Sequence, residues 1–142
     1  MTKTLITIGL FILTVYNSFG QTKDVPVPPP LDTTKIFSKV EIEASFPGGT
    51  TAWREYLEKN LKADVPAKKK APAGTYTAIV RFIVSKDGSI SDIQPETNVG
   101  YGMENEVMRV IRKGPKWTPA SQDGKKVNAY RRQPITFMIT EK

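Results

Sequence analysis

The sequence predicts an α+β fold in which two helices pack on a roughly three-stranded antiparallel sheet. The spacing of apolar residues indicates helix, strand, strand, helix and strand in that order, which is typical of a small α+β domain. The 142 residues suit a single domain. A folded part of about 100 residues buries enough surface to be stable without a metal or a disulfide.

The first twenty residues predict an export signal rather than a part of the fold. Lys3 precedes an apolar run over residues 5–16, and small and polar residues follow this run. As a helix the run is about 18 Å long, whereas a membrane-spanning helix crosses about 30 Å. We therefore expect residues 1–20 to be a cleaved signal peptide. The alternative is an uncleaved membrane anchor formed by residues 5–16.

Residues 21–39 predict an extended linker. Four of the eleven prolines lie at positions 26, 28, 29 and 30. Such a run favours a polyproline helix of about 3.1 Å per residue, which acts as a semi-rigid spacer. A ligand for SH3-type domains is the less favoured interpretation. We expect the folded domain to cover residues 40–142.

The first predicted helix covers residues 50–61 and follows a Phe-Pro-Gly-Gly turn. Four apolar residues recur at the spacing of one helical face, namely Trp53, Tyr56, Leu57 and Leu61. Residues 63–74 contain two prolines and three consecutive lysines, so we expect a solvated loop there.

A β-hairpin is predicted next, with strands at residues 75–85 and 89–94 and a tight reversal at residues 86–88. The alternation of the first strand places one set of apolar residues on a single face, namely Tyr76, Ala78, Val80, Phe82 and Val84. Ile79 and Ile83 lie on the other face, so both faces of the strand are expected to be partly covered.

The second predicted helix covers residues 103–113, with acidic residues in its first turn and basic residues in its last. The final strand is predicted at residues 125–140, with Ile135, Phe137 and Ile139 on one face. Because proline cannot donate to a sheet ladder, Pro134 predicts that this strand lies at an edge of the sheet.

The composition argues against an enzyme. The chain has no Cys and no His, which excludes thiol nucleophiles, Ser-His-Asp relays and the usual zinc sites. Nothing in the sequence brings a pair of acidic residues together for catalysis, and we expect no cofactor and no metal.

The formal net charge is 21 − 14 = +7. We interpret Lys68, Lys69 and Lys70 as solvated charge rather than as a nucleic-acid site, and Trp53, Tyr56 and Trp117 as packing residues.

Four stretches together resemble the C-terminal domain of the TonB energy-transducer family in its Bacteroidetes-type form. They are FPGG followed by AWREYLEKNL, then GTYTAIVRFIVSKDGSISDI, then GYGMENEVMRVIRKGPKWTPA, and finally AYRRQPITFMI. In this order they cover about residues 41–140. The resemblance implies the TonB C-terminal fold, two helices against a three-stranded antiparallel sheet.

The resemblance also implies a function. Family members work in the periplasm, where this domain binds the N-terminal Ton box of TonB-dependent outer-membrane transporters by adding the peptide as a strand to a sheet edge. The partner-binding residues implied here are Arg131, Arg132, Gln133, Pro134, Ile135, Thr136, Phe137, Met138 and Ile139. We expect substitutions at Ile135 or Phe137 to weaken binding while the fold stays intact. Lys125 and Lys126 are expected to add positive charge beside the edge.

Further partners depend on the N-terminal segment. If residues 5–16 are retained as an inner-membrane anchor, inner-membrane motor proteins are additional partners, and the edge strand also allows a homodimer. The linker, however, reaches only about 60 Å at about 3.1 Å per residue, which is short for crossing a periplasm. The alternative function is therefore a stand-alone structural or regulatory interaction protein of the cell envelope with no energy-transducing role.

Overall fold

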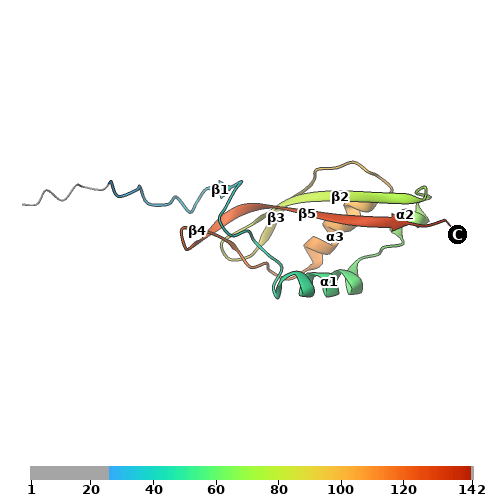
Figure 1. Ribbon diagram of the computed structural model, residues 1–142, viewed down its shortest axis with the longest axis horizontal. Coiled ribbons are helices and arrows are strands. Elements are labelled where there is room, and N and C mark those ends of the chain that lie inside the picture. The colour runs from blue at the N-terminus through green and yellow to red at the C-terminus, as the bar shows by residue number, and fades with distance from the viewer. Residues whose placement is uncertain (1–25, 142) are drawn as a thin grey trace, which may run out of the picture.

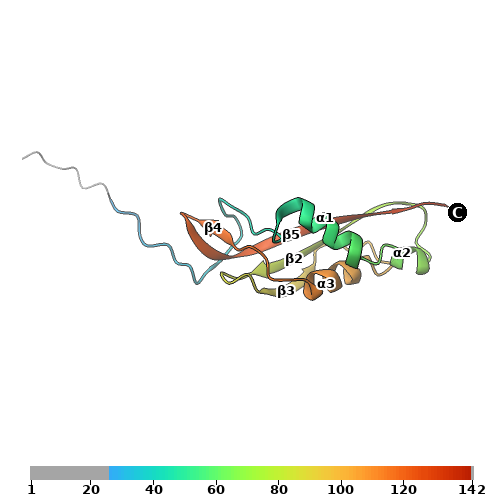
Figure 2. The ribbon, with the colours of Figure 1, turned by 90° about the horizontal axis from the view of Figure 1, so that it is seen from below.

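The computed structural model describes residues 26–141. The predicted signal peptide, residues 1–20, lies outside the described residues. In chain order the elements are β1 (Ile36–Phe37), α1 (Gly49–Asn60), α2 (Val65–Lys68), β2 (Gly74–Val84), β3 (Ile90–Pro95), α3 (Met103–Lys113), β4 (Ala120–Gln122) and β5 (Lys125–Ile139). Figures 1 and 2 show β5 running along most of the folded part.

The sheet contains five strands in the described residues. Their order is β1-β5-β2-β3, and β4 pairs with β5 off this path. The predicted α+β class with two long helices is confirmed. The predicted number of strands is wrong, because the sheet has five strands rather than three. β1 and β4 have two and three residues, too short to show a strand period. β1 also runs parallel to β5, so the sheet is mixed.

The two long helices, α1 and α3, pack against one face of the sheet (Figure 1). The predicted alternation of β2 is confirmed, because Ala78, Val80, Phe82 and Val84 are fully buried on this face. α3 adds Met103, Val107 and Ile111 to the same core, and the apolar stripe of α1 packs around it. The interpretation of Trp117 as a packing residue is confirmed as well, since its side chain is buried 5.0 Å from the Phe82 ring, centroid to centroid.

The segment that we expected to be a solvated loop, residues 63–74, contains the one-turn helix α2. Pro66 lies in its first turn, where a missing N–H costs no helical hydrogen bond, and the ring is fully buried. Lys68 and Asp64 form an ion pair of 2.5 Å across the turn. A helix of four residues is too short for a periodic apolar pattern, which is why the sequence did not indicate it.

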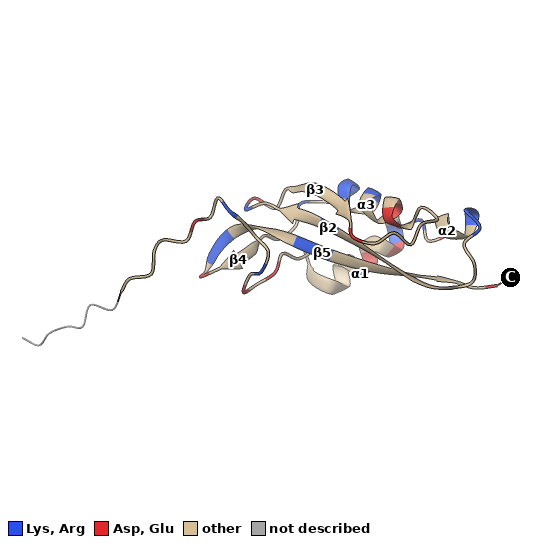
Figure 3. Ribbon diagram, turned by 90° about the horizontal axis from the view of Figure 1, so that it is seen from above, with Lys and Arg blue, Asp and Glu red and all other residues tan. Residues whose placement is uncertain are grey.

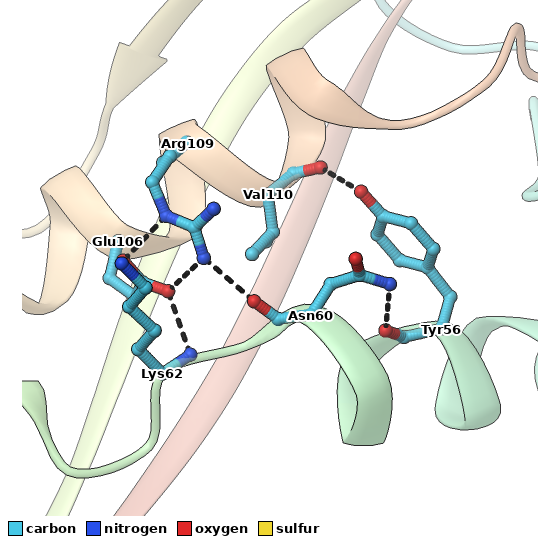
Figure 4. A network of polar contacts seen from close by, with 6 residues as sticks. All are labelled: Tyr56, Asn60, Lys62, Glu106, Arg109 and Val110. Atoms are coloured by element: carbon cyan, nitrogen blue, oxygen red, sulfur yellow. Dashed lines mark hydrogen bonds and ion pairs between the residues drawn. The ribbon is translucent and has the colours of Figure 1, made fainter.

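A buried carboxylate joins the end of α1 to α3 (Figure 4). Glu106 on α3 accepts hydrogen bonds from the backbone N–H of Lys62 at 2.8 Å and from the Arg109 guanidinium at 2.5 and 2.9 Å. Nearby, the Tyr56 hydroxyl donates to the carbonyl of Val110 at 2.7 Å. Burial by itself raises the pKa of the Glu106 carboxyl, but the hydrogen bonds outweigh burial and hold this pKa below its ordinary value.

Within residues 26–141, no helix has both the length and the apolar character needed to cross a membrane.

Candidate functional site

The edge predicted for the final strand is present along part of β5. β5 lies between β1 and β2 in the strand order, and β1 occupies its outer side at Asn128 and Ala129. The edge prediction is therefore wrong for this part of the strand. Among the described residues, positions 131–139 pair with β2 alone. We call the outer side of residues 131–139 the open edge.

The hydrogen bonds of Ile79 show which backbone groups point to the open edge. Its N–H donates to the Thr97 hydroxyl at 2.9 Å, and its carbonyl accepts from the Glu96 N–H at 2.8 Å. Both groups of Ile79 thus point away from β5, and its partner Pro134 in the antiparallel ladder directs its own groups away from β2. The residues that alternate with Pro134 do the same, namely Arg132, Thr136 and Met138.

The open edge consequently offers three N–H donors, from Arg132, Thr136 and Met138, and four carbonyls, from these residues and Pro134. Of these carbonyls, that of Pro134 also accepts a hydrogen bond from the Gln133 side-chain amide at 3.3 Å. Pro134 lacks an N–H, but its backbone nitrogen lies on the side away from β2. The proline therefore costs no hydrogen bond between β5 and β2. The physical reason for expecting an edge at Pro134 is confirmed.

The side chains of β5 divide between the two faces of the sheet. Ile135 and Phe137 point to the helices and are only 6% and 3% exposed. The expectation that substitutions at these two positions leave the fold intact is wrong, because both side chains belong to the core. Thr136 and Met138 point to the other face, where Met138 is 76% exposed.

The basic residues at the start of the open edge are held by carboxylates. Arg131 forms an ion pair with Glu43, and the Nε of Arg132 donates to Glu96 at 2.5 Å. Burial lowers the pKa of the Arg131 guanidinium from its ordinary value. Lys125 lies in the hairpin with β4, before the open edge begins. In Figure 3, the blue segments of β5 mark basic residues at its start and in the part beside β2.

Three grooves adjoin residues 130–140. The first, the arginine groove, has a volume of about 470 Å³ and is lined by Ser38, Glu43, Ile79, Arg81, Tyr130, Arg131, Arg132 and Pro134. The second, the aromatic groove, measures about 100 Å³ and is lined by Ser45, Phe46, Gly49, Thr50, Trp53, Trp117, Arg131 and Gln133. The third, the α2 groove, measures about 550 Å³ and is lined by Asp64, Ala67, Lys68, Ala71, Ile139 and Thr140.

The aromatic groove borders the core. Its wall is formed by Phe46, Trp53 and Trp117, whose rings lie 5.2 to 5.9 Å apart between centroids. Trp53 is half-buried and therefore contributes to both packing and the groove. Such rings provide an apolar surface next to Gln133 at which a small side chain of an added strand can lie.

Glu43, Arg81 and Tyr130 line the arginine groove but were not among the predicted site residues. Glu43 and Arg131 are 88 positions apart in the chain, so no local pattern connects them. Arg81 had a local signal, since it is the charged residue between two buried positions of a strand. Tyr130 has no such signal. No three acidic side chains within residues 26–141 are grouped so that they could hold a metal ion.

Comparison with protein families gives a match to part of the chain. A family model described as Gram-negative bacterial TonB protein C-terminal matches residues 67–139, just over half of the chain. The match begins within α2 and ends with the last residue of β5, so it includes the whole open edge. No curated protein and no solved structure matched the chain.

Proposed function

Because this chain belongs to the family of C-terminal domains of Gram-negative bacterial TonB proteins, we propose that it binds the Ton box of an outer-membrane transporter by strand addition to the open edge. The family connects the chain with energy-coupled transport in general. It is a family of protein-interaction domains rather than of enzymes, and its proteins are periplasmic or anchored in the envelope.

One observation carries the proposal: residues 131–139 have a strand partner on one side only among the described residues. An extended peptide can join such an edge through backbone hydrogen bonds, and pockets beside the edge then select its side chains. The aromatic groove and the α2 groove lie near the two ends of the open edge, next to Gln133 and Ile139 respectively.

The energetics favour a weak and reversible complex. Seven outward backbone groups at about 1 kcal/mol net each contribute at most about 7 kcal/mol. Association costs at least about 4 kcal/mol, which leaves about 3 kcal/mol and corresponds to a millimolar dissociation constant. A micromolar complex would need about 5 kcal/mol more, which the side chains in the grooves would have to supply.

The test is a titration of the isotope-labelled protein with synthetic peptides from the N-terminal segments of outer-membrane transporters of the same genome. We expect the NMR signals of the Arg132, Thr136 and Met138 amides to shift on binding. A matched peptide, N-methylated at alternate backbone positions, keeps its side chains but cannot pair as a strand. Equal binding of both peptides would contradict strand addition.

The alternative, an envelope interaction protein held by its basic surface, differs in its salt dependence. Association through exposed charges should weaken strongly between about 50 and 200 mM salt, because salt screens such charges. Backbone pairing should change little over the same range. A complex that resists N-methylation of the peptide but is lost at the higher salt concentration would favour this alternative.

A further inference from the structure

The arginine groove carries chemistry that strand addition does not use. Arg81, Tyr130 and Arg132 project from the face of the sheet opposite the helices, since they alternate with the buried residues of β2 and β5. Figure 3 looks onto the sheet with β2 and β5 in front of α1. Ile79 and Pro134, which are direct cross-strand partners, provide an apolar part of the groove on this face.

Two arginines lie directly opposite each other here. Arg81 on β2 pairs in register with Arg132 on β5. Like charges at directly opposite positions of an antiparallel pair destabilise a sheet. Arg132 is compensated by Glu96 and Arg131 by Glu43. Arg81 forms no ion pair with any carboxylate in residues 26–141.

Two arginines that line the groove have an Nε without an acceptor, but they leave the sheet on different faces. Arg81 projects from the groove's face, whereas Arg131 lies on the same face as Ile135 and Phe137 and also lines the aromatic groove. The Nε atoms of Arg81 and Arg131 are both buried and have no hydrogen-bond partner in the described part of the chain. Buried polar groups are almost always hydrogen-bonded in folded proteins, so an orphaned pair calls for an explanation. The Arg81 guanidinium is positioned by the Tyr130 ring, whose centroid lies 4.7 Å from its central carbon.

We propose that the arginine groove is an anion-binding site that takes a single carboxylate. Guanidinium groups match the planar geometry of a carboxylate and bind it through paired N–H donors. The local charge is 3 − 2 = +1, because the three arginines are positive and Glu43 and Glu96 are negative. One bound carboxylate would balance this charge. A phosphate dianion would exceed this charge and would lie near Glu43, which lines the groove.

The carboxylate has two sources, a free acidic sugar or an acidic side chain of a protein partner. The groove volume of about 470 Å³ falls within the usual range for small-ligand pockets. Tyr130, Ile79 and Pro134 offer ring and apolar surface for the body of either ligand. The groove shares Arg131, Arg132 and Pro134 with the open edge, whereas Arg81 lies on β2 and takes no part in strand addition.

The experiment titrates the protein with four probes and follows the Arg Nε–H signals by NMR. The probes are glucuronate, glucose as its neutral match, the side-chain carboxylate of N-acetylglutamate α-amide, and inorganic phosphate. We expect saturable millimolar shifts of the Arg81 signal with the carboxylates and none with glucose. Tighter glucuronate binding assigns a free acidic sugar, and tighter binding of the acetylglutamate amide assigns a partner's side chain.

Two variants distinguish binding in the arginine groove from non-specific attraction of anions to the positively charged surface. Arg81→Gln should weaken carboxylate binding at least tenfold, and its melting temperature should stay the same or rise because the like-charge pair is relieved. Arg112→Gln removes the same charge from an exposed position on α3 and should bind normally. The wild-type signals provide a readout even if a variant fails to fold. Absent shifts, tighter phosphate binding, or equal loss in both variants would overturn the proposal.

Discussion

Thr136→Pro tests the open edge with a single substitution. The Thr136 N–H points away from β2, so the proline removes an outward donor and no ladder hydrogen bond. One lost bond of about 1 kcal/mol weakens peptide binding about fivefold. The proline ring also lies where the added strand must approach. With Pro134 two positions away, the middle of the open edge then has no donor, and we expect at least a tenfold loss in affinity.

The assay is calorimetric titration of wild type and variants with the same transporter peptide, combined with thermal unfolding. Thr136→Val is the matched control, because it keeps the N–H while removing the hydrogen bond of 3.0 Å between the hydroxyls of Thr136 and Thr77. It should bind as wild type does. Ile135→Pro should unfold the protein, since the Ile135 N–H faces β2. A Thr136→Pro variant that folds and binds within twofold of wild type would refute the reasoning.

Three other predictions concern stability. Gly88→Ala should cost at least about 2 kcal/mol in urea unfolding, because φ is +87° and a Cβ would lie 2.2 Å from the Trp117 carbonyl oxygen; an unchanged midpoint would contradict this. Trp117→Ala should cost about 3–5 kcal/mol by the same assay, and a cost near zero would argue against its place in the core. Since the pKa of Glu106 is lowered in the folded state, its stabilisation is present above the unfolded value of about 4.3 and is lost as pH falls below it. Glu106→Gln should therefore flatten the loss of stability between about pH 5 and pH 3, and an unaltered pH profile would show that this carboxylate does not contribute.

The long elements could be predicted because their apolar residues recur over several turns or alternations. The second helix was expected at residues 103–113, and α3 covers Met103–Lys113. The strand expected at residues 125–140 is β5, Lys125–Ile139. Its alternation also assigned Ile135 and Phe137 to one face, although the sequence could not tell that this face meets the helices rather than a partner.

The short elements could not be predicted because they are defined by tertiary contacts. Ile36 and Phe37 form a strand only because β5 lies beside them, and they fall within the segment expected to be a linker. α2 depends on the burial of Pro66. In both cases, an element of two to four residues is too short to show the apolar periodicity from which a helix or strand is predicted.

The presence of an open edge could be predicted from the sequence but its geometry could not, and the binding role of its residues stays a prediction. Pro134 indicated an edge from sequence alone. Which backbone groups point outward follows from the bonds of Ile79 to Thr97 and Glu96, on other elements of the chain. The pairing of Arg81 with Arg132 depends on the register of β2 and β5, which only the fold defines.

Amide hydrogen exchange of the free, monomeric protein, read residue by residue, tests the open edge most directly. The account predicts an alternating pattern, with fast exchange at Arg132, Thr136 and Met138 and slow exchange at Gln133, Ile135 and Phe137. Slow exchange at all six amides would contradict it, because the outward N–H groups would then already be hydrogen-bonded.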